Sequence, residues 1–355
     1  MARPNSFRTR LLAWYDTHAR KLPWRAAPQA TKPRHPYRVW LSEIMLQQTR
    51  VAAVVDRYRE FLRRFPTVQK LASAREASVL AAWSGLGYYR RARLLHAAAK
   101  IIVYDLGGQF PATAEQWRAL PGIGRYTSAA IASIAFGEAI AVVDGNVERV
   151  LQRVSGQRLA GQELWGAADH LLDRKRPGDF NQAMMELGAT VCTPRAPACL
   201  TCPLVKLCTT RGEMPRSAKA PRQKKREIHC ALDHRSRAKG GGEREVLLVQ
   251  RSRDARLMAG MWELPTIASP LNLTNNDHAQ PAFTLRHSIT VTDYTVQVWS
   301  SAAPAEVRGE VRGRWIATGQ LGQVALTGLA RKILRKAGLI ATSTRRARTG
   351  CALSS

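Results

Sequence analysis

LPGIGRYTSAAI, residues Leu120–Ile131, is the stretch of this sequence that decides its fold. Pro121 and the paired Gly122 and Gly124 permit a tight turn whose backbone can approach a ligand without obstruction by side chains. The helix that follows begins with unpaired backbone amides and a positive dipole end, which together suit a phosphate group. Such a contact holds a nucleic-acid backbone without reading its bases. A plain turn between two helices could use the same residues, so the choice between a phosphate-binding turn and a plain turn depends on the rest of the chain.

Helical periodicity lies on both sides of this turn. From Phe7 to about Thr210, apolar residues recur at three- and four-residue spacing, as they do between Val54 and Phe65. Pro and Gly separate short helical stretches, and no strand pattern of any length occurs. The sequence predicts an all-α domain over residues 1–212.

The character of the sequence changes after this domain. A segment rich in Lys and Arg, residues 213–227, has little to bury and is predicted to be a basic linker. Short alternating stretches typical of strands and one apolar-periodic helix follow. We therefore predict a multidomain chain with an α+β domain over 228–340. A disordered tail rich in Ser, Thr and Arg is predicted over 341–355.

The composition is strongly basic. Lys and Arg number 55 against 26 Asp and Glu, which gives a formal charge of +29 over 355 residues. A surface so positive attracts polyanions, and the phosphate backbone is the commonest of these. The apolar runs are too short for a membrane span, and the N-terminus lacks the apolar region of a secretory signal. We expect an intracellular protein without membrane partners, in the cytoplasm with the nucleoid if the source is bacterial, and nothing demands more than a monomer.

Four of the six cysteines cluster near the end of the predicted helical domain. They are Cys192, Cys199, Cys202 and Cys208, with the spacing C-x6-C-x2-C-x5-C. In an intracellular chain such a cluster indicates metal chemistry before disulfide chemistry. Four thiolates on a compact loop can hold either zinc or a four-iron cluster, and the physical chemistry alone does not choose between them.

Two carboxyl groups have surroundings that suit different chemistry. Glu43 lies in VWLSEIMLQQTR, residues Val39–Arg50, among apolar neighbours that can keep a carboxyl protonated near neutral pH. An exposed helical Glu is the ordinary alternative. Asp144 precedes Gly-Asn and an apolar-periodic helix, so it is also a plausible helix N-cap.

The segment GLGYYRRARLL, residues Gly85–Leu95, sets two glycines and two aromatics beside three arginines. This composition suits backbone contact and insertion between bases. The alternative is a helix N-terminus with a solvated basic face.

Together these motifs resemble the adenine-glycosylase (MutY) family of the endonuclease III, or helix-hairpin-helix, superfamily. LPGIG matches the hairpin, LSEIMLQQT matches the catalytic motif, and the cysteine spacing matches the iron–sulfur loop. The resemblance covers nearly the whole chain apart from the tail. It implies a [4Fe-4S] cluster and an enzyme that excises adenine mispaired with 8-oxoguanine or guanine from double-stranded DNA.

The resemblance also implies the roles of the two carboxyl groups. Cleavage of an N-glycosidic bond needs an acid for the leaving base and an anion for the oxocarbenium ion. Glu43 would protonate adenine at N7, and Asp144 would stabilise the cation with help from Asn146. Relatives with lyase activity carry a Lys where this chain has Tyr126, and a phenol cannot form a Schiff base. The sequence therefore predicts a monofunctional glycosylase.

The target base must leave the helical stack before an acid can reach it. The resemblance implies that the pocket for the base draws on Trp24, Arg25, Tyr126, Asn146 and Glu186. It implies DNA contacts by Gln48, Thr49, Leu86, Tyr88, Gly122, Gly124 and Thr290.

The predicted second domain resembles the Nudix-like domain appended to this family. Leu247–Arg251 followed by GMWELP, residues Gly260–Pro265, carries the likeness, but the glutamate-rich metal-binding box is absent. We expect a recognition module for 8-oxoguanine. Ile289, Thr290 and Val291 stand where typical relatives have Phe-Ser-His, which predicts altered discrimination of 8-oxoguanine from guanine.

Three alternatives compete with this hypothesis. A thymine-mismatch glycosylase shares the scaffold, although LSEIMLQQT and the second domain favour adenine. A non-catalytic DNA-binding protein could use the cluster structurally, but the presence of both Glu43 and Asp144 argues against it. A Nudix pyrophosphatase is disfavoured by the missing glutamates.

Overall fold

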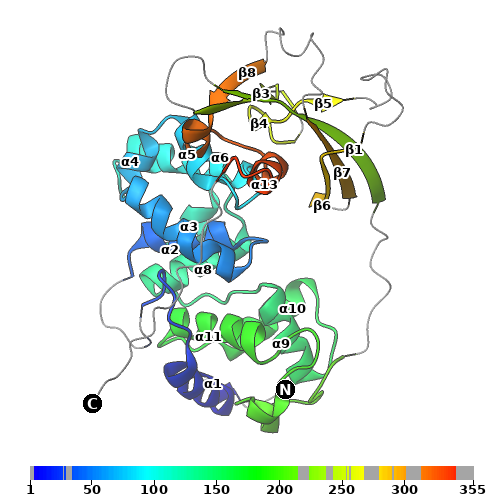
Figure 1. The fold of residues 1–355 in the computed structure, drawn as a ribbon. Helices are drawn as coiled ribbons and strands as arrows, with labels where there is room; N and C mark the ends of the chain where they lie inside the picture. The colour runs from blue at the N-terminus through cyan, green and yellow to red at the C-terminus, as the bar shows by residue number, and fades with distance from the viewer. Residues whose placement is uncertain are drawn as a thin grey trace, which may run out of the picture. The chain divides into compact units, whose positions relative to one another are not determined.

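The chain divides into two units in the computed structural model (Figure 1). Unit 1 comprises Met1–Val79 and Arg90–Lys219, and unit 2 comprises Leu80–Tyr89 and Ala220–Ser355. The structure describes residues 4–26, 28, 34–214, 224–236, 243–252, 254–255, 257–267, 280–289, 292–300 and 313–340.

The regular elements among the described residues of unit 1 are all helices, as predicted. Its main helices are α1 (Pro4–His18), α2 (Pro36–Leu46), α3 (Val51–Arg64), α4 (Val68–Ala72), the start of α5 (Glu76–Trp83), α6 (Arg90–Lys100), α7 (Ala114–Arg118), α8 (Arg125–Phe136), α9 (Gly145–Ser155), α10 (Gly161–Leu171) and α11 (Pro177–Thr190). A π-helix, η1 (Ile101–Asp105), continues α6, and two 3-10 turns, η2 (Cys199–Thr201) and η3 (Val205–Leu207), lie in the cysteine segment.

Unit 1 buries its apolar residues where its helices pack against one another. Helices α1, α9, α10 and α11 share one core, in which Phe7 packs against Phe180. Helix α2 packs against α8, and α8 in turn packs against α11. The predicted apolar face of α3 is buried at Val54, Tyr58 and Phe61. Burial of each such apolar side chain stabilises the fold by about 1.5–3 kcal/mol. The helices of unit 1 are therefore held firmly against one another.

The stretch Leu120–Ile131 forms the predicted turn between two helices, α7 and α8. Gly122 has φ +78°, a left-handed conformation that favours glycine. A Cβ at this position would lie 2.7 Å from Cβ of Leu94, so a side chain there would also clash. Gly124 is the N-cap of α8, and no side chain caps the helix there. The first amides of α8 are therefore available to a ligand.

Unit 2 is the predicted α+β part of the chain. Its strands are β1 (Lys224–Leu232), β2 (His234–Ser236), β3 (Arg244–Gln250), β4 (Trp262–Glu263), β5 (Thr266–Ile267), β6 (Phe283–Ile289), β7 (Thr292–Ser300) and β8 (Gly313–Ala317). They are followed by η5 (Thr318–Gln323) and α13 (Gly328–Lys336).

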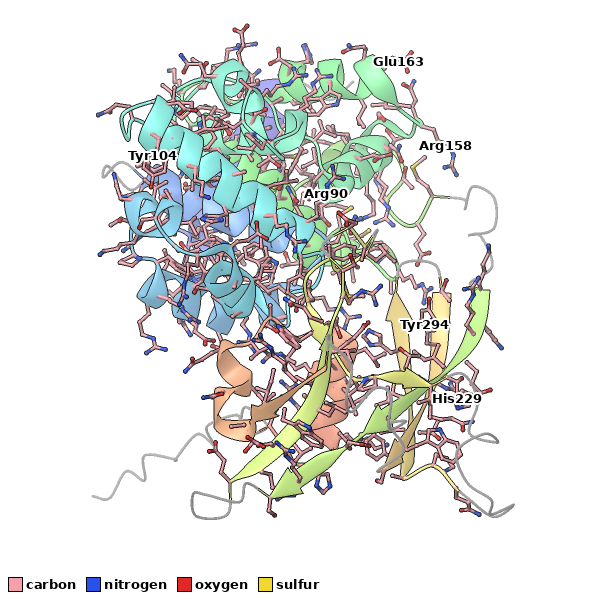
Figure 2. All side chains as sticks on the ribbon, turned by 90° about the horizontal axis from the view of Figure 1, so that it is seen from above. Arg90, Tyr104, Arg158, Glu163, His229 and Tyr294 are labelled. Carbon is pink, nitrogen blue, oxygen red and sulfur yellow. The ribbon has the colours of Figure 1, made fainter. Side chains whose placement is uncertain are left out.

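The strands of unit 2 form two sheets. One has the order β5-β1-β7-β6, and in the other β3 pairs with β2, β4 and β8. His229 on β1 and Tyr294 on β7 come from the parallel pair at the centre of the first sheet (Figure 2). Helix α13 buries Ile333 and Leu334 in the core formed with the strands. The apolar periodicity of this helix and the alternation of β7 were both visible in the sequence.

Two boundaries differ from the sequence expectation. Strand β1 begins at Lys224, inside the segment predicted as linker, because its exposed basic residues pair through their backbone with β7. The short segment Leu80–Tyr89 groups with unit 2, where Ser84 Oγ and Tyr89 Oη donate hydrogen bonds to the carbonyl oxygen of Leu326 at 3.3 and 2.8 Å. The predicted tail, most of the linker and Thr290 lie outside the described residues. Among the described helices, none is long and apolar enough to cross a membrane.

Candidate active site

Glu43 lies in α2, a helix of unit 1 whose residues are mostly buried. Helix α2 begins with Pro36, whose ring suits the first helical position, and most of its residues are buried. Glu43 itself is 6% exposed. This burial raises the pKa of its carboxyl from 4.5 to about 7. The charge of Asp144 also raises this pKa, whereas a hydrogen bond from Tyr126 and the charge of Arg25 oppose the shift.

Tyr126 is the hydrogen-bond partner of this carboxyl. It lies in the first turn of α8, directly after the glycine turn, and its Oη donates to Glu43 Oε2 at 2.7 Å. A second contact joins Oη to Met185 Sδ at 3.4 Å. Burial raises the pKa of Tyr126 well above its ordinary value, and the charges of Glu43 and Asp144 add to the effect. The phenol therefore keeps its proton and remains a donor to Glu43.

Asp144 is the N-cap of α9, as the sequence predicted on local grounds. Its Oδ1 accepts hydrogen bonds from the backbone amides of Asn146 and Val147 at 2.9 and 2.7 Å, and its Oδ2 accepts one from Asn146 Nδ2 at 2.8 Å. These donors fix the orientation of the carboxylate. Because its charge acts on both Glu43 and Tyr126, the structure brings the two predicted carboxyl groups into one site.

An ion cluster surrounds the buried carboxylate of Glu186, and its Arg25 also acts by its charge on Glu43. Glu186 on α11 is 1% exposed and accepts from Arg20 Nε and Nη2 at 2.5 and 2.9 Å and from Arg25 Nη1 at 3.0 Å. Burial alone would raise the pKa of Glu186, but the two arginines hold it below its ordinary value. Arg25 Nε is buried and has no partner among the described residues, so it is a donor available to a ligand. Sequence reasoning missed Arg20, because an Arg five residues before Arg25 gives no signal by itself.

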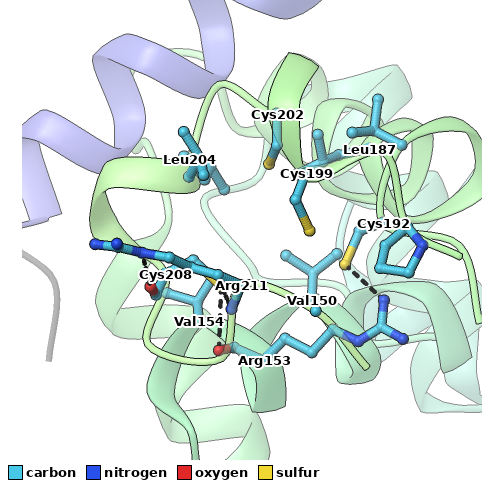
Figure 3. A pocket seen from close by; sticks show the side chains of 14 residues that line it. Val150, Arg153, Val154, Leu187, Cys192, Cys199, Cys202, Leu204, Cys208 and Arg211 are labelled. Carbon is cyan, nitrogen blue, oxygen red and sulfur yellow. Dashed lines mark hydrogen bonds between the residues drawn. The ribbon is translucent and has the colours of Figure 1, made fainter. Parts of the chain in front are cut away.

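The four cysteines line a single pocket (Figure 3). Apolar side chains such as Val150, Leu187 and Leu204 complete its wall. Arg153 Nη1 donates to Cys192 Sγ at 3.3 Å, and the amide of Arg211 donates to Cys208 Sγ at 3.4 Å. No three His, Cys, Asp or Glu side chains within the described part of the chain converge closely enough to hold a single metal ion. Four thiols around one pocket are suitable ligands for an iron–sulfur cluster, which takes one thiolate at each iron.

Comparison with known proteins identifies the family. Residues 41–161 match the HhH-GPD superfamily base excision DNA repair protein family. Adenine DNA glycosylase of Homo sapiens is 41% identical over 323 residues, which cover 75% of this chain and 58% of that protein. Adenine DNA glycosylase of Rattus norvegicus is 36% identical over 403 residues, covering 93% of this chain and 77% of that protein. The chain belongs to the adenine DNA glycosylase family.

Solved structures agree on the fold of unit 1. A thermostable thymine-DNA glycosylase is 30% identical with a TM-score of 0.54, covering 59% of this chain and 96% of that chain. A non-covalent endonuclease III–DNA complex, 22% identical with a TM-score of 0.51, shares the fold. The chain spans 58% of the human relative's length and 60% of the length of the relative from Mus musculus.

The other residues that the family resemblance singled out take varied positions. Trp24 packs edge-on against Tyr58, with ring centroids 5.3 Å apart. Gln48 lies in the turn after α2 with φ +53°. In unit 2, the Leu86 side chain is buried and Tyr88 is half exposed with φ +46°. Gly122 and Gly124 lie in the hairpin turn. Thr49 Oγ1 accepts a hydrogen bond from Arg91 Nη2 at 3.0 Å.

A chain of hydrogen bonds joins the cysteine pocket to Asp144. Arg149 on α9 donates from Nε to the carbonyl oxygen of Cys192 at 2.8 Å and from Nη2 to Asn146 Oδ1 at 2.9 Å. Asn146 in turn donates to Asp144. Sequence reasoning missed Arg149, although its spacing from Asn146 places both on one face of the predicted helix. The shared helix face was the one sequence signal that could have linked Arg149 to Asn146 and to the cysteine loop.

Proposed function

We propose that this chain is a monofunctional DNA glycosylase that removes adenine mispaired with 8-oxoguanine or guanine from double-stranded DNA. The observation that carries the proposal is the pair formed by buried Glu43 and Tyr126 beside Asp144. A carboxyl with a pKa of about 7 is protonated in about half of the molecules at pH 7, so it can transfer a proton at neutral pH. Membership of the adenine DNA glycosylase family supports adenine as the base.

The reaction follows from the environments of the two carboxyl groups. Glu43 gives its proton to N7 of a flipped-out adenine, so that the base leaves as a neutral molecule while the glycosidic bond breaks. The oriented carboxylate of Asp144 stabilises the positive charge that develops on the sugar. Water then adds to the sugar cation and releases a proton, which returns Glu43 to its acid form, and the product is an abasic site. Arg25 Nε, buried beside the acid, supplies a hydrogen-bond donor for the base.

The same site predicts no efficient strand cleavage. A lyase forms a Schiff base through an amine. Tyr126 is a phenol whose oxygen is engaged with Glu43, so it provides no such nucleophile. Borohydride trapping of an enzyme–DNA adduct at the yield of a true lyase would contradict this part of the proposal.

The DNA is proposed to contact the hairpin turn and the basic surface. The unpaired amides after Gly124 suit a phosphate, and the charge of +29 supplies long-range attraction. Unit 2, with its Nudix-like sequence features, is proposed to recognise 8-oxoguanine opposite the adenine. DNA binding should weaken as salt is added: the logarithm of the association constant should fall against the logarithm of the salt concentration with a slope of about −0.9 for each neutralised phosphate.

A [4Fe-4S] cluster is proposed for the cysteine pocket. Cys192, Cys199, Cys202 and Cys208 would each supply one thiolate, and the donors from Arg153 and Arg211 would stabilise the sulfur charges. When bound, the cluster supplies structural order to the loop. Iron and sulfide in the purified protein support this assignment, whereas zinc alone refutes it.

Base release under single-turnover conditions tests the proposed function. We would compare duplexes containing A:8-oxoguanine, A:G and G:T, because a thymine-DNA glycosylase shares the fold. Adenine should be released from the first two, and Glu43→Gln should abolish release while it retains DNA binding. Glu115→Gln, at an exposed position on α7, is the matched control. Release of thymine alone, or full activity of Glu43→Gln, would contradict the proposal.

A further inference from the structure

Arg91 makes an unusual set of contacts inside unit 1. It lies in the first turn of α6, and its Nη1 donates to the carbonyl oxygens of Ile44 and Met45 at 2.9 and 3.0 Å and to that of Gln47. Its Nη2 donates to Thr49 Oγ1 at 3.0 Å. One guanidinium therefore joins the start of α6 to the end of α2 and to the turn that follows.

These carbonyls are groups that a helix cannot satisfy by itself. The last carbonyls of an α-helix have no intrahelical partner, and the helix end carries a partial negative charge. Helix α2 has no basic residue in its own last turn. Thr49 N donates to the carbonyl oxygen of Leu46 at 3.1 Å, and Arg91 supplies both further donors and a positive charge. The end of α2 is thus capped by a residue 45 positions away from Leu46 in the chain.

The segment that Arg91 holds contains the chemistry of the site. Glu43 precedes Ile44 directly, so it belongs to the last turn of α2. Gln48 has φ +53°, a strained conformation for a side chain that is not glycine or asparagine, and it persists only where neighbours enforce it. Gln47 Nε2 also donates to Thr127 Oγ1 at 3.1 Å, next to Tyr126 on α8. The turn therefore ties α2 to the helix that carries the partner of Glu43.

We propose that Arg91 is a positioning residue for base release, acting through the last turn of α2 and the turn at Gln48 rather than on the substrate. This inference rests on the proposed function. A fork of donors in a rigid plane explains why an arginine is used, because a lysine ammonium cannot span carbonyls and a threonine hydroxyl at once. Without the fork, the last turn of α2 loosens, and water reaches the carboxyl of Glu43.

The test compares Arg91→Met and Arg91→Lys with the unmodified protein. Lys100→Gln, which removes an exposed charge from the far end of α6, is the control and should match the unmodified protein. Misplacement of a reacting group by about 1 Å can cost on the order of 10²-fold in rate. We expect Arg91→Met to lower the single-turnover rate constant by that order with little change in DNA affinity, and Arg91→Lys to retain an intermediate rate. If Arg91 were a phosphate contact, affinity would fall instead and the salt slope would shrink by about 1.

A second readout separates positioning from a merely structural role. The groups that face Glu43 are Tyr126 from α8, Asp144 before α9 and Arg25 after α1. Entry of water lowers the pKa of Glu43, so the alkaline limb of the pH–rate profile should move to lower pH in Arg91→Met. A lower melting temperature with an unchanged rate constant and limb would overturn the proposal. If Arg91→Met does not fold, a rate constant of Arg91→Lys equal to that of the unmodified protein would also overturn the proposal.

A third measurement does not require catalysis. Glu43→Gln should raise the melting temperature more at pH 8.5 than at pH 5.5, because the ionised carboxyl is penalised by burial. In the Arg91→Met background this pH-dependent gain should shrink, since the carboxyl is already hydrated. An equal gain in both backgrounds would overturn the proposal. If the unmodified protein releases no base, the proposed function fails, and this measurement still shows whether Arg91 keeps water from the carboxyl of Glu43.

Discussion

The hydrogen bond between Tyr126 and Glu43 offers the sharpest test of the proposed acid. Tyr126→Phe removes the hydroxyl that donates to Glu43 Oε2 at 2.7 Å and leaves the ring in place. That hydrogen bond stabilises the ionised carboxyl, and so it lowers the pKa of Glu43 against the upward effect of burial. Its loss should therefore raise the pKa of Glu43 further.

The size of the shift follows from the strength of the bond. A hydrogen bond to a charged group contributes about 1.5–3 kcal/mol, and one pKa unit corresponds to about 1.4 kcal/mol. Because the phenol can also accept from the protonated acid, we take the lower end of this range. The pKa of Glu43 should rise by about one unit, from about 7 to about 8.

The sign of the effect on rate is fixed by the role of the group. A general acid works in its protonated form, so the rate is high below its pKa and falls above it. At pH 8, about one-tenth of Glu43 is protonated in the unmodified protein and about half in the variant. Relative to its own plateau, the variant should therefore be about fivefold faster at pH 8.

Single-turnover adenine release from pH 5 to pH 9.5 measures this directly. Tyr104→Phe is the matched control, because Tyr104 is 63% exposed on η1 and projects away from the helices (Figure 2). Its profile should superimpose on that of the unmodified protein. A limb that stays in place or moves to lower pH in Tyr126→Phe would refute the assignment of the limb to Glu43.

Three further predictions concern the groups around this pair. Glu43→Gln should raise the free energy of unfolding by up to about 3 kcal/mol above pH 7. Folding raises the pKa of Glu43 from 4.5 to about 7, so the ionised carboxyl destabilises the fold by an amount that grows between these pH values and is absent below them. A denaturation series from pH 4 to pH 9 would show no such growth if Glu43 were hydrated. Arg149→Met should slow base release about tenfold or more while iron content is kept, because it frees Asn146 from the cysteine loop; an unchanged rate constant would count against the link. Cys202→Ser should reduce both the iron content and the melting temperature, and a full complement of iron would exclude Cys202 as a ligand.

Much of the fold and part of the site could be predicted from local patterns. The turn at Gly122 was predictable because only glycine tolerates both its φ and the close approach of Leu94. The N-cap role of Asp144 was visible in Asp-Gly-Asn before an apolar-periodic helix. Burial of Glu43 followed from its apolar neighbours. Each of these signals depends on residues within one or two helical turns.

The contacts that span long distances in the chain could not be predicted in this way. Arg20 and Glu186 are 166 residues apart, and Arg91 and Ile44 are 47 residues apart. An arginine in a sequence gives no sign of which carbonyl or carboxylate its guanidinium reaches, because a long flexible side chain leaves the direction open. The strand at Lys224 was missed for a related reason. Its exposed basic residues resemble a linker, whereas the pairing that makes them a strand comes from β7.

The different chemistry of the two carboxyl groups follows from where each lies on its helix. Inside α2, the neighbouring backbone amides already donate to carbonyls of the preceding turn, so none is available to stabilise an ionised Glu43. At the start of α9 the amides have no intrahelical acceptor, and two of them bind Asp144. An acid therefore belongs in the body of a buried helix and an anion at a helix N-cap. Exchange of the two residues, Glu43→Asp with Asp144→Glu, would keep both carboxyl groups but change the length of each side chain by one methylene. The hydrogen bonds at the N-cap of α9 would weaken most, because they require the shorter side chain.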